Sequence, residues 1–230
     1  MNASCAAFAC ALIVVGVGSA ARADDNDNDN DNDNDNGSSK RIALIQRSLD
    51  DAAPGAARWR TGWMIAHAAL AVGQGGLALA TGDLRRQRPY LVGASESTLA
   101  LAVDILSPHP ATNAGDELRG IDGSTPEARR TKLARAERLL DDAAAAQSRR
   151  RSWLAHAGPV MVAAGGASVL LLGYDQKTDA ALSFAGALIG GELQIATAPT
   201  AAIEAREVYR SKFTVTVVPF AGGAAILGTF

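Results

Sequence analysis

One uncharged stretch, residues 153–174, constrains the fold more than any other part of the chain. It carries no charge apart from the titratable His156, and three arginines at positions 149–151 precede it directly. A helix of this length measures roughly 30 Å, which is the thickness of the hydrocarbon core of a bilayer. Trp153 and Tyr174 stand at its two ends, where aromatic side chains collect in membrane helices. The stretch is therefore predicted to span a membrane or to be the central helix of a water-soluble bundle.

Three weaker apolar segments accompany this stretch and indicate the fold class. They cover residues 59–82, 89–106 and 180–198, and they are rich in alanine and glycine, which lets helices approach one another closely. We predict an all-α fold: a helical bundle of four long apolar segments, arranged as two helical hairpins and expected to be embedded in a membrane. A basic amphipathic helix and a short C-terminal β-hairpin complete the predicted fold.

The N-terminus has the pattern of an export signal. An apolar run leads to Ala21-Arg22-Ala23, an A-x-A cleavage site directly before Asp24. The first four residues contain no Lys or Arg, so an uncleaved anchor is the alternative. Cys5 and Cys10 both lie in this segment, so thiol and disulfide chemistry are not expected in the mature chain. We predict that residues 1–23 are a signal peptide.

A run of alternating Asp and Asn separates this segment from the body of the chain. It holds seven acidic residues between positions 24 and 36 and nothing apolar, so its charges repel one another and no core can form. Residues 24–39 are therefore predicted to be a disordered linker. We expect a helical bundle domain over residues 40–212. A hairpin or tail follows over 213–230, where β-branched residues alternate before a Gly-Gly pair.

Helix signals divide the body further. A short helix is predicted over residues 40–52, ending before Pro54, and residues 111–123 are rich in Gly, Asp and Asn and predict a loop. Thr125-Pro126-Glu127 is a good helix start, and nothing breaks the basic helix that follows before Trp153. A last amphipathic helix is expected over 201–212. The less charged side of the basic helix consists of Leu133, Ala136, Leu140, Ala143, Ala144 and Gln147.

Insertion energies rank the four apolar segments. Each Leu, Ile, Val or Phe contributes about −0.3 to −0.6 kcal/mol, whereas an acid at the helix centre costs about 2.5 to 3.5 kcal/mol. Segment 153–174 has no acid and should insert, but segment 89–106 contains Glu96 and Asp104 and should not insert alone. Two topologies follow. Four spans would place the basic helix outside after export. If segment 89–106 does not cross, the basic helix lies on the cytoplasmic surface.

Polar residues inside the apolar segments are the best candidates for a functional site. An ionisable residue within a membrane bundle is a functional candidate by default, able to bind a metal or to relay protons. The alternative is that such residues pair and form hydrogen bonds that fix helix packing. We expect packing, because no Glu-x-x-His spacing of the di-iron type is found. The candidate buried polar site consists of His67, Gln74, Glu96, Asp104, His156 and Glu192.

A faint internal repeat supports the two hairpins. Trp-Met-Ile-Ala-His67 and Trp-Leu-Ala-His156 each open an apolar segment, and the segment that follows each of them holds one glutamate, Glu96 or Glu192. The spacings differ by one to several residues. The pattern predicts two related helical hairpins with equivalent His and Glu positions.

The sequence carries no catalytic, cofactor or metal motif. Residues 73–78 fit a nucleotide-binding glycine pattern, but no strand precedes them. The basic helix lacks the interleaved aromatic residues expected of nucleic-acid binding. We therefore expect neither an enzyme nor a cofactor, and no nucleic-acid partner. The expected partners are the lipid bilayer and other envelope proteins, or a second copy that contacts the Gly186 and Gly190 pair.

These observations predict an exported helical envelope protein with a structural or accessory role, integral to the inner membrane. A periplasmic or outer-membrane-associated location is the alternative. Two other functions remain open. One is a membrane protein that binds a small solute, a proton or a metal through its buried His and Glu residues, and the other is a soluble exported binding bundle.

Overall fold

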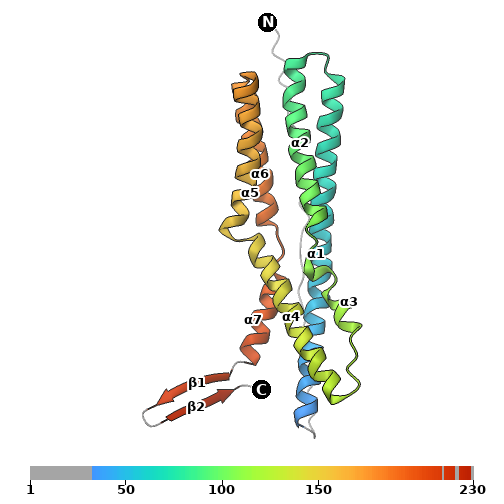
Figure 1. Ribbon diagram of the computed structural model, residues 1–230, viewed down its shortest axis with the longest axis vertical. Coiled ribbons are helices and arrows are strands. Elements are labelled where there is room, and N and C mark those ends of the chain that lie inside the picture. The colour runs from blue at the N-terminus through green and yellow to red at the C-terminus, as the bar shows by residue number, and fades with distance from the viewer. Residues whose placement is uncertain (1–32, 214, 221–222, 229–230) are drawn as a thin grey trace. The chain divides into compact units, whose positions relative to one another are not determined.

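The structure, a computed structural model, describes residues 33–213, 215–220 and 223–228, with side chains from residue 36 to residue 213. This part of the chain is mostly helical, in agreement with the predicted all-α class (Figure 1). In chain order the elements are α1 (Asp33–Ala80), α2 (Leu84–Leu106), the 3-10 turn η1 (Pro110–Thr112), α3 (Ala114–Arg119), α4 (Pro126–Arg150), α5 (Trp153–Ser168), the π-helical turn η2 (Val169–Gly173), α6 (Lys177–Ala196), α7 (Ala201–Lys212), β1 (Val215–Phe220) and β2 (Gly223–Gly228).

The apolar segments pair as two helical hairpins (Figure 1). In hairpin A, residues 59–80 of α1 lie along α2, and in hairpin B, α5 and η2 lie along α6. Asp83 caps α2, because its carboxylate accepts a hydrogen bond from the backbone N–H of Arg85 at 3.0 Å. Asp175 adopts a left-handed conformation, with φ of 51°, in the turn before α6. Asp tolerates this conformation better than most residues, so the turn is compatible with its sequence.

The remaining helices pack around a conventional apolar core, and we call this part the head. It consists of residues 33–58 of α1, together with η1, α3, α4 and α7. Ile45, Leu118 and Leu140 are among the fully buried side chains of this core. The predicted inner side of α4 is confirmed, since five of its six residues are buried and Leu133 packs partly buried against the core. The predicted cap is confirmed as well: the Thr125 hydroxyl accepts from the Ala128 N–H at 3.1 Å.

Helix α1 is continuous where the sequence predicts a break before Pro54, and that prediction is wrong. Proline inside a helix removes a hydrogen bond and costs about 3 kcal/mol. Burial of Ala52 and Ala56, on either side of Pro54, in the core of the head offsets this cost. The helix also begins at Asp33, so the last part of the predicted linker 24–39 is helical. Extending an existing helix adds one hydrogen bond per residue, and acidic residues favour the N-terminal end of its dipole.

Two further boundaries differ from prediction. The predicted loop 111–123 contains α3. Ala114 and Leu118 are buried in the core of the head, and this burial offsets the entropy cost of forming a short helix. The basic helix does not continue into Trp153: it ends at Arg150, and Ser152 is extended, with φ of −77° and ψ of 162°. The last helix, predicted over residues 201–212, is confirmed as α7.

The C-terminal strands are described by their backbone alone. β1 and β2 are antiparallel, with Val215 opposite Gly228. The predicted signal peptide, residues 1–23, and most of the predicted linker lie outside the described residues. They remain predictions, as does the C-terminal hairpin as a unit of the fold.

Length and composition allow a membrane location for three described helical stretches: Asn36–Ala80, Trp153–Gly173 and Lys177–Lys212. Helix α2 is not among them. The large apolar side chains of both hairpins are nevertheless mainly on the outside. Strongly exposed examples are Val72 and Leu79 on α1, Leu106 on α2, Met161 on α5 and Leu172 on η2. A water-soluble bundle would need its most apolar helix at the centre. Here that stretch, α5 with η2, exposes large apolar side chains instead.

Candidate functional site

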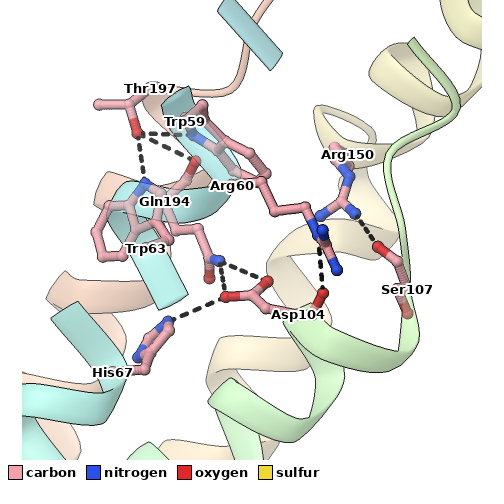
Figure 2. Close-up of polar contacts among 9 residues, drawn as sticks. All are labelled: Trp59, Arg60, Trp63, His67, Asp104, Ser107, Arg150, Gln194 and Thr197. Atoms are coloured by element: carbon pink, nitrogen blue, oxygen red, sulfur yellow. Dashed lines mark hydrogen bonds and ion pairs between the residues drawn. The ribbon is translucent and has the colours of Figure 1, made fainter. Parts of the chain in front are cut away.

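A cluster of polar contacts surrounds Asp104, a buried residue near the end of α2 (Figure 2). The side-chain amide of Gln194, on α6, donates to both carboxylate oxygens of Asp104, at 3.1 and 3.2 Å. The imidazole Nε2 of His67, on α1, lies 3.7 Å from Oδ2 of Asp104. This separation is too long for a hydrogen bond but suits an ion pair when the imidazole is protonated. Three helices therefore meet at one carboxylate.

Arginine side chains bind the helix ends beside this carboxylate. Arg60 donates to the backbone oxygens of Asp104 and Ile105, both at 3.3 Å, and Arg150 donates to the oxygen of Ser107 at 3.1 Å. Arg151 donates to the oxygen of Ala198, just beyond α6, at 2.7 Å. The last carbonyls of a helix lack helical partners and carry partial negative charge, so cations stabilise this end. These arginines anchor the ends of α2 and α6 to α1 and α4.

Two tryptophans hold the end of α6 against α1. The indole N–H groups of Trp59 and Trp63 both donate to the hydroxyl of Thr197, at 3.2 Å each (Figure 2). That hydroxyl in turn donates to the oxygen of Leu193 at 2.7 Å. The guanidinium of Arg150 lies 5.1 Å from the centre of the Trp59 ring, which is a cation–π contact. Indole rings with a wet edge and an apolar body are typical of a membrane–water boundary.

A buried imidazole lies on the head side of this cluster. His109 is 1 % exposed, and its ring meets Trp59 edge to face at a centroid distance of 6.5 Å. Burial, and then the nearby charge of Arg150, lower the pKa of His109 to about 4. The ring is therefore neutral at pH 7. Its Nδ1 accepts a hydrogen bond from the Ala111 N–H at 3.3 Å and so caps η1. Burial also lowers the pKa of Arg150, and the charge of Asp104 opposes this shift.

Hairpin B has a similar contact between histidine and carboxylate, but on its surface. Nδ1 of His156, on α5, lies 2.8 Å from a carboxylate oxygen of Glu192, on α6, and both side chains are nearly half exposed. In each hairpin the histidine lies in the first half of the first apolar segment, and its acid lies near the end of the second helix. The structural counterpart of Glu192 is therefore Asp104. The internal repeat in the sequence had suggested Glu96 instead.

The other two candidate residues pack against glycines of a facing helix. A Cβ atom placed on Gly93 of α2 would overlap the side-chain amide of Gln74 on α1. A Cβ atom placed on Gly166 of α5 would overlap the carboxylate of Glu96 on α2. The hydroxyl of Ser183 lies 3.4 Å from both Glu96 carboxylate oxygens. Gln74 and Glu96 thus occupy the space that a side chain at Gly93 or Gly166 would fill.

An apolar groove of about 570 Å³ runs between α2 and α5 beside Glu96. At the end nearest the helix–helix turns, the guanidinium of Arg88 lies 4.2 Å from the centre of the Tyr174 ring. The π-helical turn η2 adjoins this end, and π-helical turns are common at functional sites. The groove is lined by Arg88, Leu91, Val92, Ser95, Glu96, Leu99, Met161, Val162, Gly165, Gly166, Val169 and Tyr174.

The six candidate residues therefore do not form one site. His67 and Asp104 meet, His156 and Glu192 meet elsewhere, and Glu96 and Gln74 lie at separate glycines. In the described part of the chain, no group of three His, Cys, Asp or Glu residues is placed to hold a metal ion.

Sequence reasoning missed three partners of the cluster, namely Gln194, Arg60 and Arg150. Both arginines lie at the start of an apolar segment, Arg60 as the second residue of 59–82 and Arg150 just before 153–174, which is the one signal that they carry in the sequence. The helix end that each one binds depends on the tertiary fold.

The chemistry of the cluster suits the joining of helices, because the Asp104 carboxylate and the arginine-bound carbonyl oxygens at the ends of α2 and α6 accept from donors on other elements. Compared with protein-family models, curated proteins and solved structures, this chain matches none of them.

Proposed function

We propose that this protein is an integral membrane protein of the cell envelope with a structural or accessory role. In this proposal hairpins A and B cross the bilayer together, and the head lies in water on one side. One observation carries the proposal: both hairpins expose their large apolar side chains, whereas Asp104 and Glu96 of hairpin A face Gln194 and Ser183 of hairpin B. Such an arrangement is unfavourable in water and favourable in hydrocarbon.

The acids of α2 do not oppose this arrangement. Asp104 is buried and accepts two hydrogen bonds from Gln194, and Glu96 faces Ser183 and the bare backbone at Gly166. The insertion cost expected for residues 89–106 applies to an isolated helix whose acids face lipid. In the packed hairpins those acids face α5 and α6 of hairpin B instead of lipid, so α2 crosses together with its partner helices.

The boundary between head and hairpins has the chemistry of a membrane surface. Trp59, Trp63 and the strongly exposed Trp153 gather there, along with arginines that bind helix ends. Aromatic and basic side chains are enriched at this level of membrane proteins. The proposal therefore places the head on one side of the bilayer and the turns at residues 81–83 and 174–176 on the other.

The contacts of the cluster support a structural role. They supply hydrogen bonds and cations at helix ends rather than a nucleophile with an adjacent base. A second candidate function, binding of a small amphiphilic molecule, is favoured by the groove beside Glu96. The predicted C-terminal hairpin belongs to the proposal as an extension beyond α7.

The proposal is tested by membrane extraction together with cysteine labelling of the full chain. We expect the protein to stay in the membrane through an alkaline carbonate wash and to dissolve only in detergent. Ala134, Gly82 and Thr178 are exposed and can each be replaced by cysteine. A label that cannot cross the bilayer should reach Cys at 134 from one side and Cys at 82 or 178 from the other. The wild-type chain measures the background from Cys5 and Cys10.

Two outcomes would contradict the proposal. Recovery in the soluble fraction without detergent would exclude a membrane protein. Labelling of positions 134 and 82 from the same side would exclude a crossing hairpin A, even if the protein stayed in the membrane.

A further inference from the structure

We propose that the groove between α2 and α5 binds one anionic phospholipid, with its phosphate at Arg88 and one acyl chain along the groove. This inference rests on the proposed membrane function, because the groove opens on the apolar outer surface of the hairpins. It goes further by assigning a specific ligand class to one place on that surface.

The walls and floor of the groove suit a hydrocarbon chain. Leu91, Leu99 and Met161 are exposed and line it, and they would remain uncovered if the groove were empty of lipid. Gly165 contributes open space, since a Cβ atom placed there would meet nothing within 4 Å. From Arg88 to Leu99 the helix rises about 16 Å, which is about half of the 30 Å hydrocarbon core. The groove therefore has the depth of one lipid leaflet.

The polar end of the groove suits an anion. The Arg88 guanidinium is stacked on the Tyr174 ring, which orients the group while leaving its N–H donors available for a phosphate. Arg85 and Arg86 precede it on the first turn of α2, at the level where lipid headgroups would lie. Basic side chains at that level attract anionic lipids.

The carboxylate of Glu96 does not compete for the guanidinium. It lies about 12 Å further along α2 and is engaged with Ser183 against Gly166. The protein thus presents a cation at the headgroup level and an apolar groove below it. This arrangement is complementary to the phosphate and the acyl chain of an anionic phospholipid.

The test uses the full chain, purified in detergent, stripped of lipid and examined by native mass spectrometry. Palmitoyl-oleoyl phosphatidylglycerol is added to one sample, and the phosphatidylcholine with the same acyl chains is added to another. We expect one tightly bound phosphatidylglycerol per chain, with an affinity about tenfold above that for phosphatidylcholine, as a charge-assisted contact provides. Arg88→Gln should remove this preference.

A second pair of variants tests the acyl-chain part of the groove. Gly165→Leu places a side chain in the groove, where its Cβ atom would meet nothing within 4 Å, and it should weaken binding of both lipids about tenfold. Gly158→Leu is the matched control, because it lies on the same helix, has open space around it and does not line the groove. Its lipid binding should equal that of the wild type.

Equal binding of the two lipids by the wild type, or binding unchanged in both Arg88→Gln and Gly165→Leu, would overturn the inference. The protein would then carry only non-specific boundary lipid and could still be integral to the membrane. A protein recovered without detergent would instead overturn both this inference and the proposed function. Thermal unfolding of each variant in detergent shows whether a loss of binding is merely a loss of fold.

Discussion

The head and the hairpins differ in where they place their large apolar side chains. In the head, Ile45, Leu118 and Leu140 are fully buried, and charged pairs such as Arg119 with Asp50 lie at the surface. In the hairpins, the buried positions include Asp104 and Ser97, whereas Leu79 is 86 % exposed. Both regions are helical and rich in alanine, so helix formation does not explain the difference. In the proposed membrane location, the difference lies in the medium that each region faces.

This contrast also explains which interactions stabilise each region. The head can gain free energy by removing apolar surface from water. The proposed hydrocarbon surroundings offer the hairpins no such gain, so close approach at glycines and hydrogen bonds between helices would hold them together. The contacts of Gln74 with Gly93 and of Gln194 with Asp104 are of this kind.

A leucine truncation in each region should separate them most clearly. Leu140→Ala in the head should lower the free energy of unfolding by about 2 to 5 kcal/mol, because it leaves a cavity in a packed core. Leu79→Ala in hairpin A should change it by less than about 0.5 kcal/mol in detergent, because its side chain makes few contacts. Denaturant unfolding of both variants measures this. Equal losses would show that Leu79 is packed and that the contrast is wrong.

An aspartate on the outer surface should reveal the medium directly. Val72→Asp, near the middle of residues 59–80, should cost about 2.5 to 3.5 kcal/mol of membrane insertion if that surface faces lipid. Val208→Asp on α7 makes the same chemical change on an exposed position of the head, and it should cost at most about 1 kcal/mol. The fraction of each variant that resists the carbonate wash is the measurement. If neither substitution changed the fraction that resists the carbonate wash, Val72 would face water and hairpin A would not cross the bilayer.

Acid should weaken the head through His109. Its folded pKa of about 4 lies below the unfolded value of about 6.5, so the unfolded chain binds more protons between these values. The contribution of His109 to the free energy of unfolding is therefore fully present above about pH 6.5. It should fall by up to about 3 kcal/mol as the pH is lowered through this range to about 4.

Unfolding of the head, followed by the tryptophan fluorescence to which Trp59 beside the imidazole contributes, reports this loss. His109→Asn keeps a side chain that can cap η1 but does not titrate, so it should flatten the pH dependence. An unchanged slope in this variant would assign the acid sensitivity to other groups.

Much of the helical part could be predicted from sequence because its signals are local. The capping Thr125, the inner side of α4 and the limits of α7 follow from periodicity and turn chemistry over a few residues. The pairing of consecutive apolar segments into hairpins follows from short polar turns between them. The same local reasoning failed at Pro54, where burial on both sides of the proline outweighs its helix-breaking effect.

The sequence by itself determined the helical class, the apolar segments and the polar residues within them, since composition and spacing are properties of the chain. Only the tertiary structure decided which polar residues meet. It paired Asp104 with His67 and Gln194 and left Glu96 against Gly166, although both acids lie on one helix. The physical reason is that partner choice depends on the rotation and separation of packed helices, and these arise from contacts between residues far apart in the chain.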